Sequence, residues 1–224
     1  MRRALAETPY VEQSAVVPVP AGRLQGQLHV PQGAVGCVIF AHGSGSSRHS
    51  PRNKYVTEVL HEHGLGTLLI DLLTPKEEEI DSRTRELRFD ISGLADRLIR
   101  ASAWVRRNQN TSILPVGYFG ASTGSAAALV AAAEDPDGVG AIVSRGGRPD
   151  LARSYLSRVR APTLLMVGGA DAPVIRMNED AQAQIRSSVR MEIIPGATHL
   201  FEEPGALEKV AELASAWFCQ YLEI

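Results

Sequence analysis

Three residues in this sequence have the types that nucleophilic catalysis requires. Ser122 is the centre of the pentapeptide GASTG, Asp171 follows the tripeptide GGA, and His199 lies within the segment PGATHLF. A serine hydroxyl is a weak nucleophile until a neighbouring base accepts its proton, and a histidine held by a carboxylate is such a base. We therefore predict that Ser122, Asp171 and His199 form a catalytic triad for acyl transfer.

The pentapeptide around Ser122 has the small residues that a sharp turn needs. It follows the apolar run Val116–Phe119 and precedes an alanine-rich segment that extends to Glu134. A strand that turns directly into a helix exposes the serine, and this turn requires tiny residues two positions before and after it. The Thr123 N–H would then lie at the start of a helix, where it can donate to a developing oxyanion. The alternative is a glycine-rich turn with an unused serine, which fits this position less well.

Asp171 and His199 each follow a short apolar run of their own, Thr163–Val167 and Met191–Ile194. Taken singly, an aspartate after a strand is usually a turn or cap residue, and a lone loop histidine is more often structural. The order serine, aspartate, histidine, with each residue after a separate strand, is nevertheless that of one large class of hydrolases. The three weak signals therefore support one another.

The segment AHGSGSS at residues 41–47 ends another apolar run, Cys37–Ala41, and its glycines let the backbone approach a substrate closely. We expect the Ser44 N–H to be the second oxyanion donor. His42 is expected to brace this loop, since His199 already supplies the base. A phosphate-binding loop is the alternative interpretation, but the segment lacks the full glycine spacing and the lysine of such loops.

Two further residues are candidates for substrate binding. Arg145 follows the apolar run Val139–Ser144, so it is expected near the same edge of the sheet. It would either form a structural ion pair, with Asp150 or Asp71, or recognise a carboxylate or phosphate on the substrate. His49 lies in a loop near the expected site and is a weaker candidate.

The elements that must position these residues are predicted from hydrophobic patterns. Short apolar runs without polar alternation are typical of strands buried on both faces of a parallel sheet. They are Cys37–Ala41, Gly66–Ile70, Val116–Phe119, Val139–Ser144, Thr163–Val167 and Met191–Ile194. Helical patterns separate them, which predicts a mostly parallel sheet with helices on both faces.

Several helices can be placed within this pattern. Ser50 and Pro51 are typical of a helix start, and the helix is expected to run to about Leu65. One face of a long helix is marked by Leu87, Ile91, Leu94, Leu98 and Val105, and one face of a C-terminal helix by Leu207, Val210, Ala214, Trp217 and Tyr221. The first 35 residues instead contain two alternating runs, Val11–Val19 and Leu24–Val30, which predict an antiparallel hairpin at one sheet edge.

Two segments bear on access to the site. Leu72–Glu86 is charged and has no clear period, so we expect either a solvated loop or a flap beside the active site. About 18 residues separate Val139–Ser144 from the run at Thr163, and they hold only one expected short helix, Asp150–Arg158. This leaves no room for a cap domain, and we predict an open, shallow site for small acyl groups.

Composition excludes several functional classes. The 224 residues are 44% hydrophobic and 21% charged with a net charge of −2, which predicts one globular domain over 1–224 and no nucleic-acid partner. Cys37 and Cys219 do not make a disulfide framework. No apolar run approaches the roughly 20 residues of a membrane helix, and Met1–Glu7 lacks the apolar core of a signal peptide. We therefore expect a cytoplasmic monomer or homodimer without membrane contact.

Metal and cofactor chemistry is not expected either. His61 and His63 lie two positions apart on a predicted helix and face different directions. They have no second pair of ligands, so no zinc site is predicted. His29 falls in the N-terminal hairpin, and no motif for an organic cofactor is present.

From about residue 25 onward, the chain resembles the dienelactone-hydrolase-like branch of the α/β-hydrolase superfamily. The resemblance rests on the segment HGSG at 42–45, the turn at Ser122, the segment GAD at 169–171 and the segment GATHLF at 196–201. It implies a sheet of about eight strands and the same roles for these residues. Dienelactone hydrolases proper carry a cysteine nucleophile, so Ser122 favours an esterase. Similar chains that contain the stretch 46–53 also occur fused to phosphoribosyltransferase-like domains, and no such domain is expected here.

These observations predict a serine hydrolase that cleaves small carboxylic esters. A thioesterase, a lactonase and a peptidase remain alternatives, because the same triad serves them all and fold does not choose among them. A non-catalytic binding protein on a hydrolase scaffold is the remaining alternative, which an intact triad disfavours.

Overall fold

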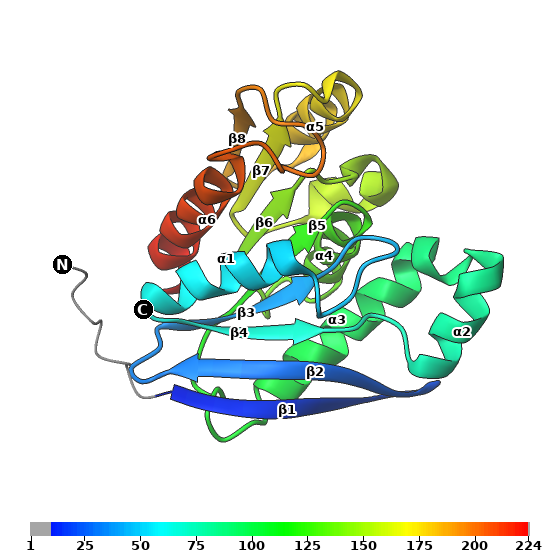
Figure 1. Cartoon of the computed structure of the whole chain (residues 1–224), viewed down its shortest axis with the longest axis vertical. Helices are drawn as coiled ribbons and strands as arrows, with labels where there is room; N and C mark the ends of the chain where they lie inside the picture. The colour runs from blue at the N-terminus through cyan, green and yellow to red at the C-terminus, as the bar shows by residue number, and fades with distance from the viewer. Residues whose placement is uncertain (1–9, 224) are drawn as a thin grey trace.

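A single eight-stranded sheet organises the chain in the computed structural model, which describes residues 10–223 (Figure 1). The segment Met1–Glu7, expected above not to be a signal peptide, lies outside the described residues. The strands are β1 (Tyr10–Val19), β2 (Gly22–Pro31), β3 (Gly36–Ala41), β4 (Leu65–Ile70), β5 (Val116–Ala121), β6 (Ala141–Arg145), β7 (Thr163–Gly168) and β8 (Val189–Ile194). Their order across the sheet is β1-β2-β4-β3-β5-β6-β7-β8.

The six predicted apolar runs all form strands, and these strands are parallel to one another. Every residue of β3 to β7 is buried, which explains why their sequences are apolar without alternation. β8 is the exception, because it lies at the sheet edge and is only partly buried. All parallel strands have their carboxyl ends at one edge of the sheet, so Ser122, Asp171 and His199 emerge on the same side.

The N-terminal hairpin is also confirmed. β1 pairs with β2 in antiparallel register, with Val19 opposite Gly22 across a tight turn, and β2 pairs with β4. Burial along β2 alternates, since one side of the strand packs on the core and the other is open. The hairpin extends the sheet beyond β4 and leaves β1 at the edge (Figure 1).

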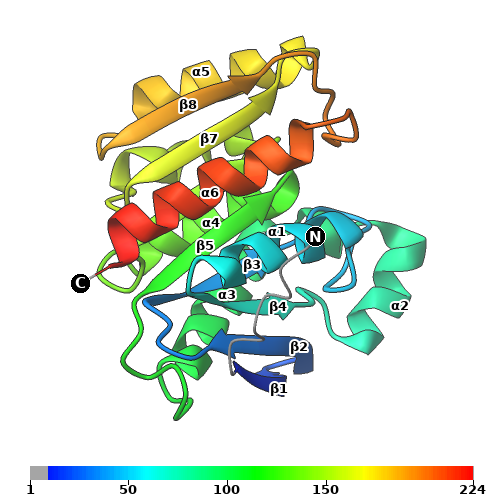
Figure 2. The same ribbon diagram turned by 60° about the vertical axis from the view of Figure 1, so that its left-hand side comes forward.

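Helices cover both faces of the sheet, as predicted (Figure 2). They are α1 (Pro51–Glu62), α2 (Pro75–Thr84), α3 (Ile91–Val105), α4 (Thr123–Glu134), α5 (Ala172–Gln184) and α6 (Ala206–Leu222), with the 3₁₀ segments η1 (Leu87–Phe89) and η2 (Pro149–Arg158). Apolar residues of α1 and α6 form the core on one face. Those of α3, α4, α5 and η2 form the core on the other.

Two predicted helices differ from the structure at their ends. α1 begins as predicted, with Pro51 at its first position and the Ser50 hydroxyl accepting a hydrogen bond from a backbone N–H. It ends at Glu62 rather than near Leu65, because Leu65 already belongs to β4. The long helix predicted to start at Leu87 is divided, since Asp90 caps α3 and places Leu87 in η1.

The segment Leu72–Glu86 is not the irregular loop that its charge suggested. Most of it forms α2, whose first turn is closed by a capping box: Thr74 accepts from the Glu77 N–H, and the Glu77 carboxylate accepts from the Thr74 N–H. Proline at the first helical position reinforces this start. The motif was present in the sequence, but the helix lacks an apolar face, so periodicity gave no signal.

The connection between β6 and β7 holds only η2, so no cap domain is present among residues 10–223. Over the same range, no helix combines the length and apolar character needed to cross a membrane. The described residues also contain no cluster of three or more His, Cys, Asp or Glu side chains arranged to hold a metal ion.

A histidine stack at the hairpin leads to a prediction about acid stability. The His61 ring lies 3.8 Å from the His29 ring, centroid to centroid, and its Nε2 lies 2.7 Å from the Thr67 hydroxyl. Burial, followed by repulsion from His29, lowers the pKa of His61 from 6.5 to about 3. The unfolded chain therefore binds a proton that the folded chain does not. The stabilisation is complete above pH 6.5 and is lost as the pH falls toward 3.

We expect urea unfolding to show this loss between pH 7.5 and pH 5. For one proton the slope approaches about 1.4 kcal/mol per pH unit. His61→Gln should flatten the dependence, whereas His63→Gln, at an exposed neighbouring site, should leave it unchanged. Equal slopes in both variants would contradict the assignment to His61.

Candidate active site

Ser122 occupies a strained backbone turn between β5 and α4. Its φ is 50° and its ψ is −119°, a conformation that non-glycine residues rarely adopt. Two backbone hydrogen bonds hold the turn: the Ser122 N–H donates to the Arg145 carbonyl at 3.1 Å, and the Ser122 carbonyl accepts from the Arg148 N–H at 3.2 Å. The turn presents the serine side chain at the carboxyl edge of the sheet, as the pentapeptide predicted.

Both glycines of the pentapeptide are required by close packing. A Cβ at Gly120 would lie 2.5 Å from the Cα of Ser125, and one at Gly124 would lie 2.2 Å from the carbonyl oxygen of Ala41. These distances are far shorter than any tolerated contact, so the first turn of α4 can approach β5 and the loop after β3 only with glycine at both positions. The spacing in the motif therefore has a direct steric cause.

Asp171 and His199 are joined by a hydrogen bond of 2.8 Å between Asp171 Oδ2 and His199 Nδ1. Their two loops are tied together by backbone bonds, including one from the Ala170 N–H to the Ala197 carbonyl at 2.9 Å. The Asp171 side chain is 16% exposed and that of His199 is 39% exposed. The carboxylate is therefore shielded while the imidazole faces the open side.

His199 also lies beside the turn that holds Ser122. A Cβ at Gly146 would lie 3.5 Å from Cε1 of the His199 ring, and Gly146 directly follows Arg145, whose carbonyl binds the Ser122 N–H. In this resting arrangement the Ser122 hydroxyl makes no hydrogen bond within the described residues. Catalytic hydrogen bonds of unliganded enzymes often tighten only when the substrate binds. The structure thus places the three predicted triad residues around one corner of the sheet edge.

Ser44 and Thr123 lie together beside Ser122. The Thr123 hydroxyl donates to the Ser44 hydroxyl at 3.3 Å, and a Cβ at Gly43 would lie 3.2 Å from the Cβ of Ser122. In the described part of the chain, neither the Ser44 N–H nor the Thr123 N–H donates to another backbone group. Both amides are therefore available to a negatively charged oxygen formed at Ser122.

His42 fastens this loop to the end of β4. Its Nε2 accepts a hydrogen bond from the Leu72 N–H at 3.1 Å, and its Nδ1 lies 2.9 Å from the Gly43 carbonyl. This pairing requires the proton on Nδ1, and burial lowers the pKa of His42, which favours the neutral ring. The geometry agrees with the bracing role predicted for His42.

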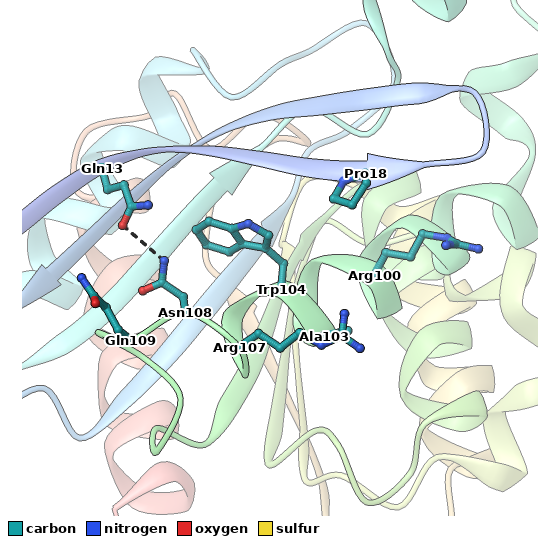
Figure 3. A pocket seen from close by; sticks show the side chains of 8 residues that line it. All are labelled: Gln13, Pro18, Arg100, Ala103, Trp104, Arg107, Asn108 and Gln109. Carbon is teal, nitrogen blue, oxygen red and sulfur yellow. Dashed lines mark hydrogen bonds between the residues drawn. The ribbon is translucent and has the colours of Figure 1, made fainter.

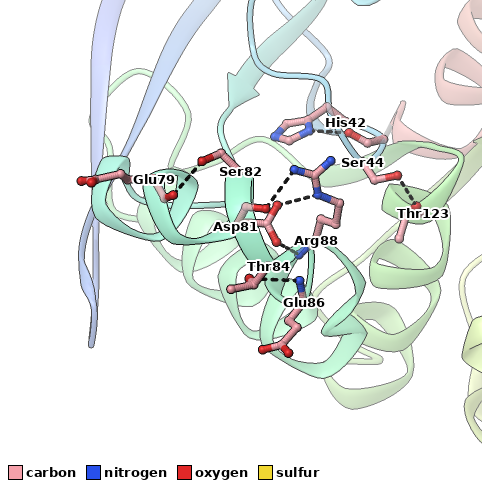
Figure 4. A network of polar contacts seen from close by, with 10 residues as sticks. His42, Ser44, Glu79, Asp81, Ser82, Thr84, Glu86, Arg88 and Thr123 are labelled. Carbon is pink, nitrogen blue, oxygen red and sulfur yellow. Dashed lines mark hydrogen bonds and ion pairs between the residues drawn. The ribbon is translucent and has the colours of Figure 1, made fainter.

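The segment that follows β4 reaches the same loop (Figure 4). Asp81 of α2 is 1% exposed, and its carboxylate accepts from the Arg88 backbone N–H at 3.0 Å and from Arg88 Nε at 2.5 Å. The Arg88 guanidinium in turn approaches Gly45, where a Cβ would lie 3.6 Å from Nη1. A cavity of about 20 Å³ separates α2 from Ser44 and Thr123. Leu72–Glu86 therefore lies beside the site, and its action as a flap stays a prediction.

Arg145 does not form either of the ion pairs considered from the sequence. Asp71 pairs with Arg48, and Asp150 pairs with Arg148 at 2.8 Å. The Arg145 side chain is buried and its guanidinium carbon lies 5.9 Å from the centre of the Phe119 ring. Burial, together with a second nearby arginine, lowers the pKa of Arg145 to about 10. The structural ion-pair interpretation is wrong, because both candidate carboxylates have other partners.

His49 is exposed. Its backbone N–H donates a hydrogen bond to the Ser47 hydroxyl at 3.2 Å. The structure does not bring its side chain to the triad, so its role in substrate binding stays a prediction.

A second hollow lies away from these residues, between β1 and α3 (Figure 3). This groove of about 610 Å³ is lined by Gln13, Pro18, Arg100, Ala103, Trp104, Arg107, Asn108 and Gln109. Its lining contains no carboxylate, histidine, serine or cysteine. It therefore offers no nucleophile and no general base, and the triad edge is the better candidate for chemistry.

The fold, with a serine on a strand-to-helix turn and an aspartate-histidine pair after later strands, defines an α/β-hydrolase. A sequence model of the dienelactone hydrolase family matches residues 24–222, and the chain belongs to that family. The crystal structure of dienelactone hydrolase from Anabaena variabilis ATCC 29413 is 64% identical. Its TM-score with this chain is 0.92, over 95% of this chain and 98% of that one. The resemblance predicted from the motifs is confirmed.

More distant structures share the fold alone. Est1E from Butyrivibrio proteoclasticus is 16% identical with a TM-score of 0.77, over 92% of this chain and 98% of that chain. Two curated relatives from strains of Mycobacterium tuberculosis, each named "Putative phosphoribosyl transferase", are 54% identical over 222 residues. That match includes 98% of this chain, which spans about half, 48%, of the relatives' length.

Proposed function

We propose that this member of the dienelactone hydrolase family is a serine hydrolase that cleaves small carboxylic esters through an acyl-enzyme on Ser122. The observation that carries the proposal is the strained turn of Ser122 beside His199, whose Nδ1 lies 2.8 Å from Oδ2 of Asp171. A backbone strain of this kind persists only where the surrounding structure enforces it, and it exposes the hydroxyl for attack.

The proposed reaction has two steps. The Ser122 oxygen forms a bond to the ester carbonyl carbon while its proton passes to His199, and the N–H groups of Ser44 and Thr123 bind the oxyanion. The carbon–oxygen bond to the alcohol breaks, and the alcohol leaves with the proton from His199. Water then attacks the acyl carbon while its proton passes to His199. The bond between the Ser122 oxygen and the acyl carbon breaks, the proton returns from His199 to Ser122, and the carboxylic acid leaves. Asp171 keeps the imidazole in the tautomer that accepts at Nε2.

Small esters are the proposed substrates because the site is open. His199 is 39% exposed, and no cap domain covers it within residues 10–223. Thioesters, lactones and peptides use the same chemistry, and a panel of these substrates would rank them by kcat/KM. The name of the mycobacterial relatives supplies no second candidate, because this chain spans only 48% of their length.

Covalent labelling tests the proposal. A fluorophosphonate probe should react with one equivalent of protein, and peptide mass analysis should place the adduct on Ser122. The same protein should hydrolyse p-nitrophenyl acetate. Absence of labelling on the folded protein would favour the non-catalytic alternative.

Gly124→Ala should reduce activity by displacing the oxyanion loop. The new methyl group would lie 2.2 Å from the Ala41 carbonyl oxygen and 2.5 Å from that of His42, both backbone atoms. We expect kcat to fall about 100-fold, as when one oxyanion donor is lost, and stability to fall by about 1–3 kcal/mol from overpacking. Steady-state hydrolysis and urea unfolding would measure the two effects.

Gly33→Ala is the matched control. Gly33 is exposed at a φ of 76° with open space around it. Its replacement should also cost stability through backbone strain but leave kcat unchanged. Full activity in Gly124→Ala would contradict the proposed position of the oxyanion loop.

A further inference from the structure

The side chain of Arg145 is buried, and within residues 10–223 one of its guanidinium nitrogens has no partner. Arg145 is 8% exposed, and its Nη1 is sealed from solvent without a hydrogen-bond acceptor. Across the described residues, no carboxylate forms an ion pair with it. An unpaired buried arginine charge is strongly destabilising, and the face of Phe119, at 5.9 Å, offsets only a small part of that cost. A bound anion would supply the missing hydrogen-bond acceptor and neutralise this buried charge.

A second arginine acts on Arg145 through its charge. After the larger effect of burial, the like charge of Arg52, in the first turn of α1, lowers the pKa of Arg145. The Arg52 Nη1 binds Glu202 at 2.8 Å, while its Nε is buried without an acceptor. Arg52 is 32% exposed along its side chain, so it lies nearer the surface than Arg145. The positive end of α1 adds to the potential of the two side chains.

The backbone of Arg145 adjoins the proposed reaction centre. The Arg145 carbonyl accepts the hydrogen bond that holds the Ser122 N–H, at 3.1 Å. The next residue, Gly146, lies against the loop of His199, with a virtual Cβ 3.2 Å from the His199 carbonyl and 3.3 Å from the Phe201 ring. Arg145 thus lies where its strand meets the histidine loop, and Arg52 joins the start of α1 to Glu202 of that loop.

We propose that Arg145, assisted by Arg52, is an oxyanion-binding subsite that receives a carboxylate or phosphate carried on the substrate, next to the ester that Ser122 attacks. The inference rests on the proposed hydrolase function and narrows its substrates to anionic esters. A guanidinium presents paired N–H donors that match two oxygens of either group. The position of Arg145 after a predicted strand indicated a binding role, whereas nothing in the sequence linked it to Arg52, which lies 93 residues away.

Matched esters test the preference. p-Nitrophenyl hemiglutarate carries a carboxylate that p-nitrophenyl valerate lacks, and p-nitrophenyl 3-phosphonopropanoate carries a phosphonate instead. The wild-type protein should have a higher kcat/KM for at least one anionic ester than for the neutral one. Arg145→Met should lower kcat/KM for that ester about 10- to 100-fold, the usual effect of losing hydrogen bonds to a charged group. The loss for the neutral ester should be much smaller, so that the ratio of kcat/KM for the anionic ester to that for the neutral ester falls about 10-fold or more.

The control is Arg160→Met. Arg160 is 72% exposed and only 3.6 Å from the exposed Asp137, so its loss should alter neither ester. Arg145→Lys keeps the charge without the paired donors and should retain part of the preference. The relative response to carboxylate and phosphonate esters identifies the preferred anion. No wild-type preference for either anionic ester, or equal losses for charged and neutral esters in Arg145→Met, would overturn the proposal.

A binding measurement separates this proposal from the catalytic one. In the Ser122→Ala protein, succinate or inorganic phosphate should raise the melting temperature, and the rise should vanish when Arg145→Met is added. Anion binding of this kind together with a wild-type protein that hydrolyses no ester would support the subsite while contradicting the proposed reaction. Esterase activity with no anion-dependent shift would reject the subsite alone.

Discussion

Ser122→Ala will reduce ester hydrolysis by about 10⁴- to 10⁶-fold in kcat while the protein stays folded. The loss is large because, in the proposed mechanism, the hydroxyl oxygen forms the bond to the acyl group, and the remaining groups can only bind and polarise the ester. Hydrolysis of p-nitrophenyl acetate and reaction with a fluorophosphonate probe should both disappear. Circular dichroism should remain that of the wild type, because the side chain changes by one exposed oxygen.

Ser112→Ala is the matched control, since Ser112 is exposed and precedes β5, at the opposite end of that strand from Ser122. It should label and hydrolyse as the wild type does. Ser122→Gly should be as inactive as Ser122→Ala but more stable, because glycine adopts the φ of 50° without the strain of a side chain. Turnover retained in Ser122→Ala would sink the assignment of the nucleophile.

Asp171→Asn will lower kcat by about 10⁴-fold at neutral pH with little change in KM. The carboxylate now accepts the hydrogen bond from His199 Nδ1 at 2.8 Å. An asparagine amide can donate to Nδ1 instead, which moves the imidazole proton to Nε2 and removes the base that faces Ser122. The histidine also loses the negative charge that stabilises its cation in the transition state.

The split between kcat and KM distinguishes this role from a structural one. Substrate binding and folding should be largely retained, while the rate of fluorophosphonate labelling falls with kcat. Asp137 is an exposed aspartate in the connection between α4 and β6. Asp137→Asn should leave every measurement unchanged. A kcat within tenfold of the wild type would show that Asp171 does not orient the base.

Much of the fold could be predicted because each prediction depended on local chemistry. A strand buried on both faces must be apolar throughout, so β3 to β7 are visible in the sequence as uninterrupted runs. The pentapeptide at 120–124 is equally local. Its two glycines are required because a Cβ at either position would lie 2.2 or 2.5 Å from neighbouring backbone atoms. Because Ser122, Asp171 and His199 each follow a parallel strand, their positions in the chain were enough to predict that they lie at one edge of the sheet.

Helix ends and the segment after β4 were less predictable for a physical reason. α2 has no apolar face, so its stability depends on the capping box at Thr74 and on the buried pair of Asp81 and Arg88. Periodicity detects burial of apolar groups, and this helix buries an ion pair instead. The result is a helix beside Ser44 where the sequence suggested a solvated segment.

The sequence by itself determined the class of chemistry: a serine, a histidine and an aspartate, each placed after its own strand. Only the tertiary structure showed which charged groups pair with Arg145 and which do not, because an ion pair depends on which side chains meet in space. Asp71 and Asp150 lie close to other arginines, Arg48 and Arg148, and so are not available to it. Among residues 10–223 no carboxylate pairs with Arg145, and the charge of Arg52 opposes its own, an arrangement that sequence separation does not reveal.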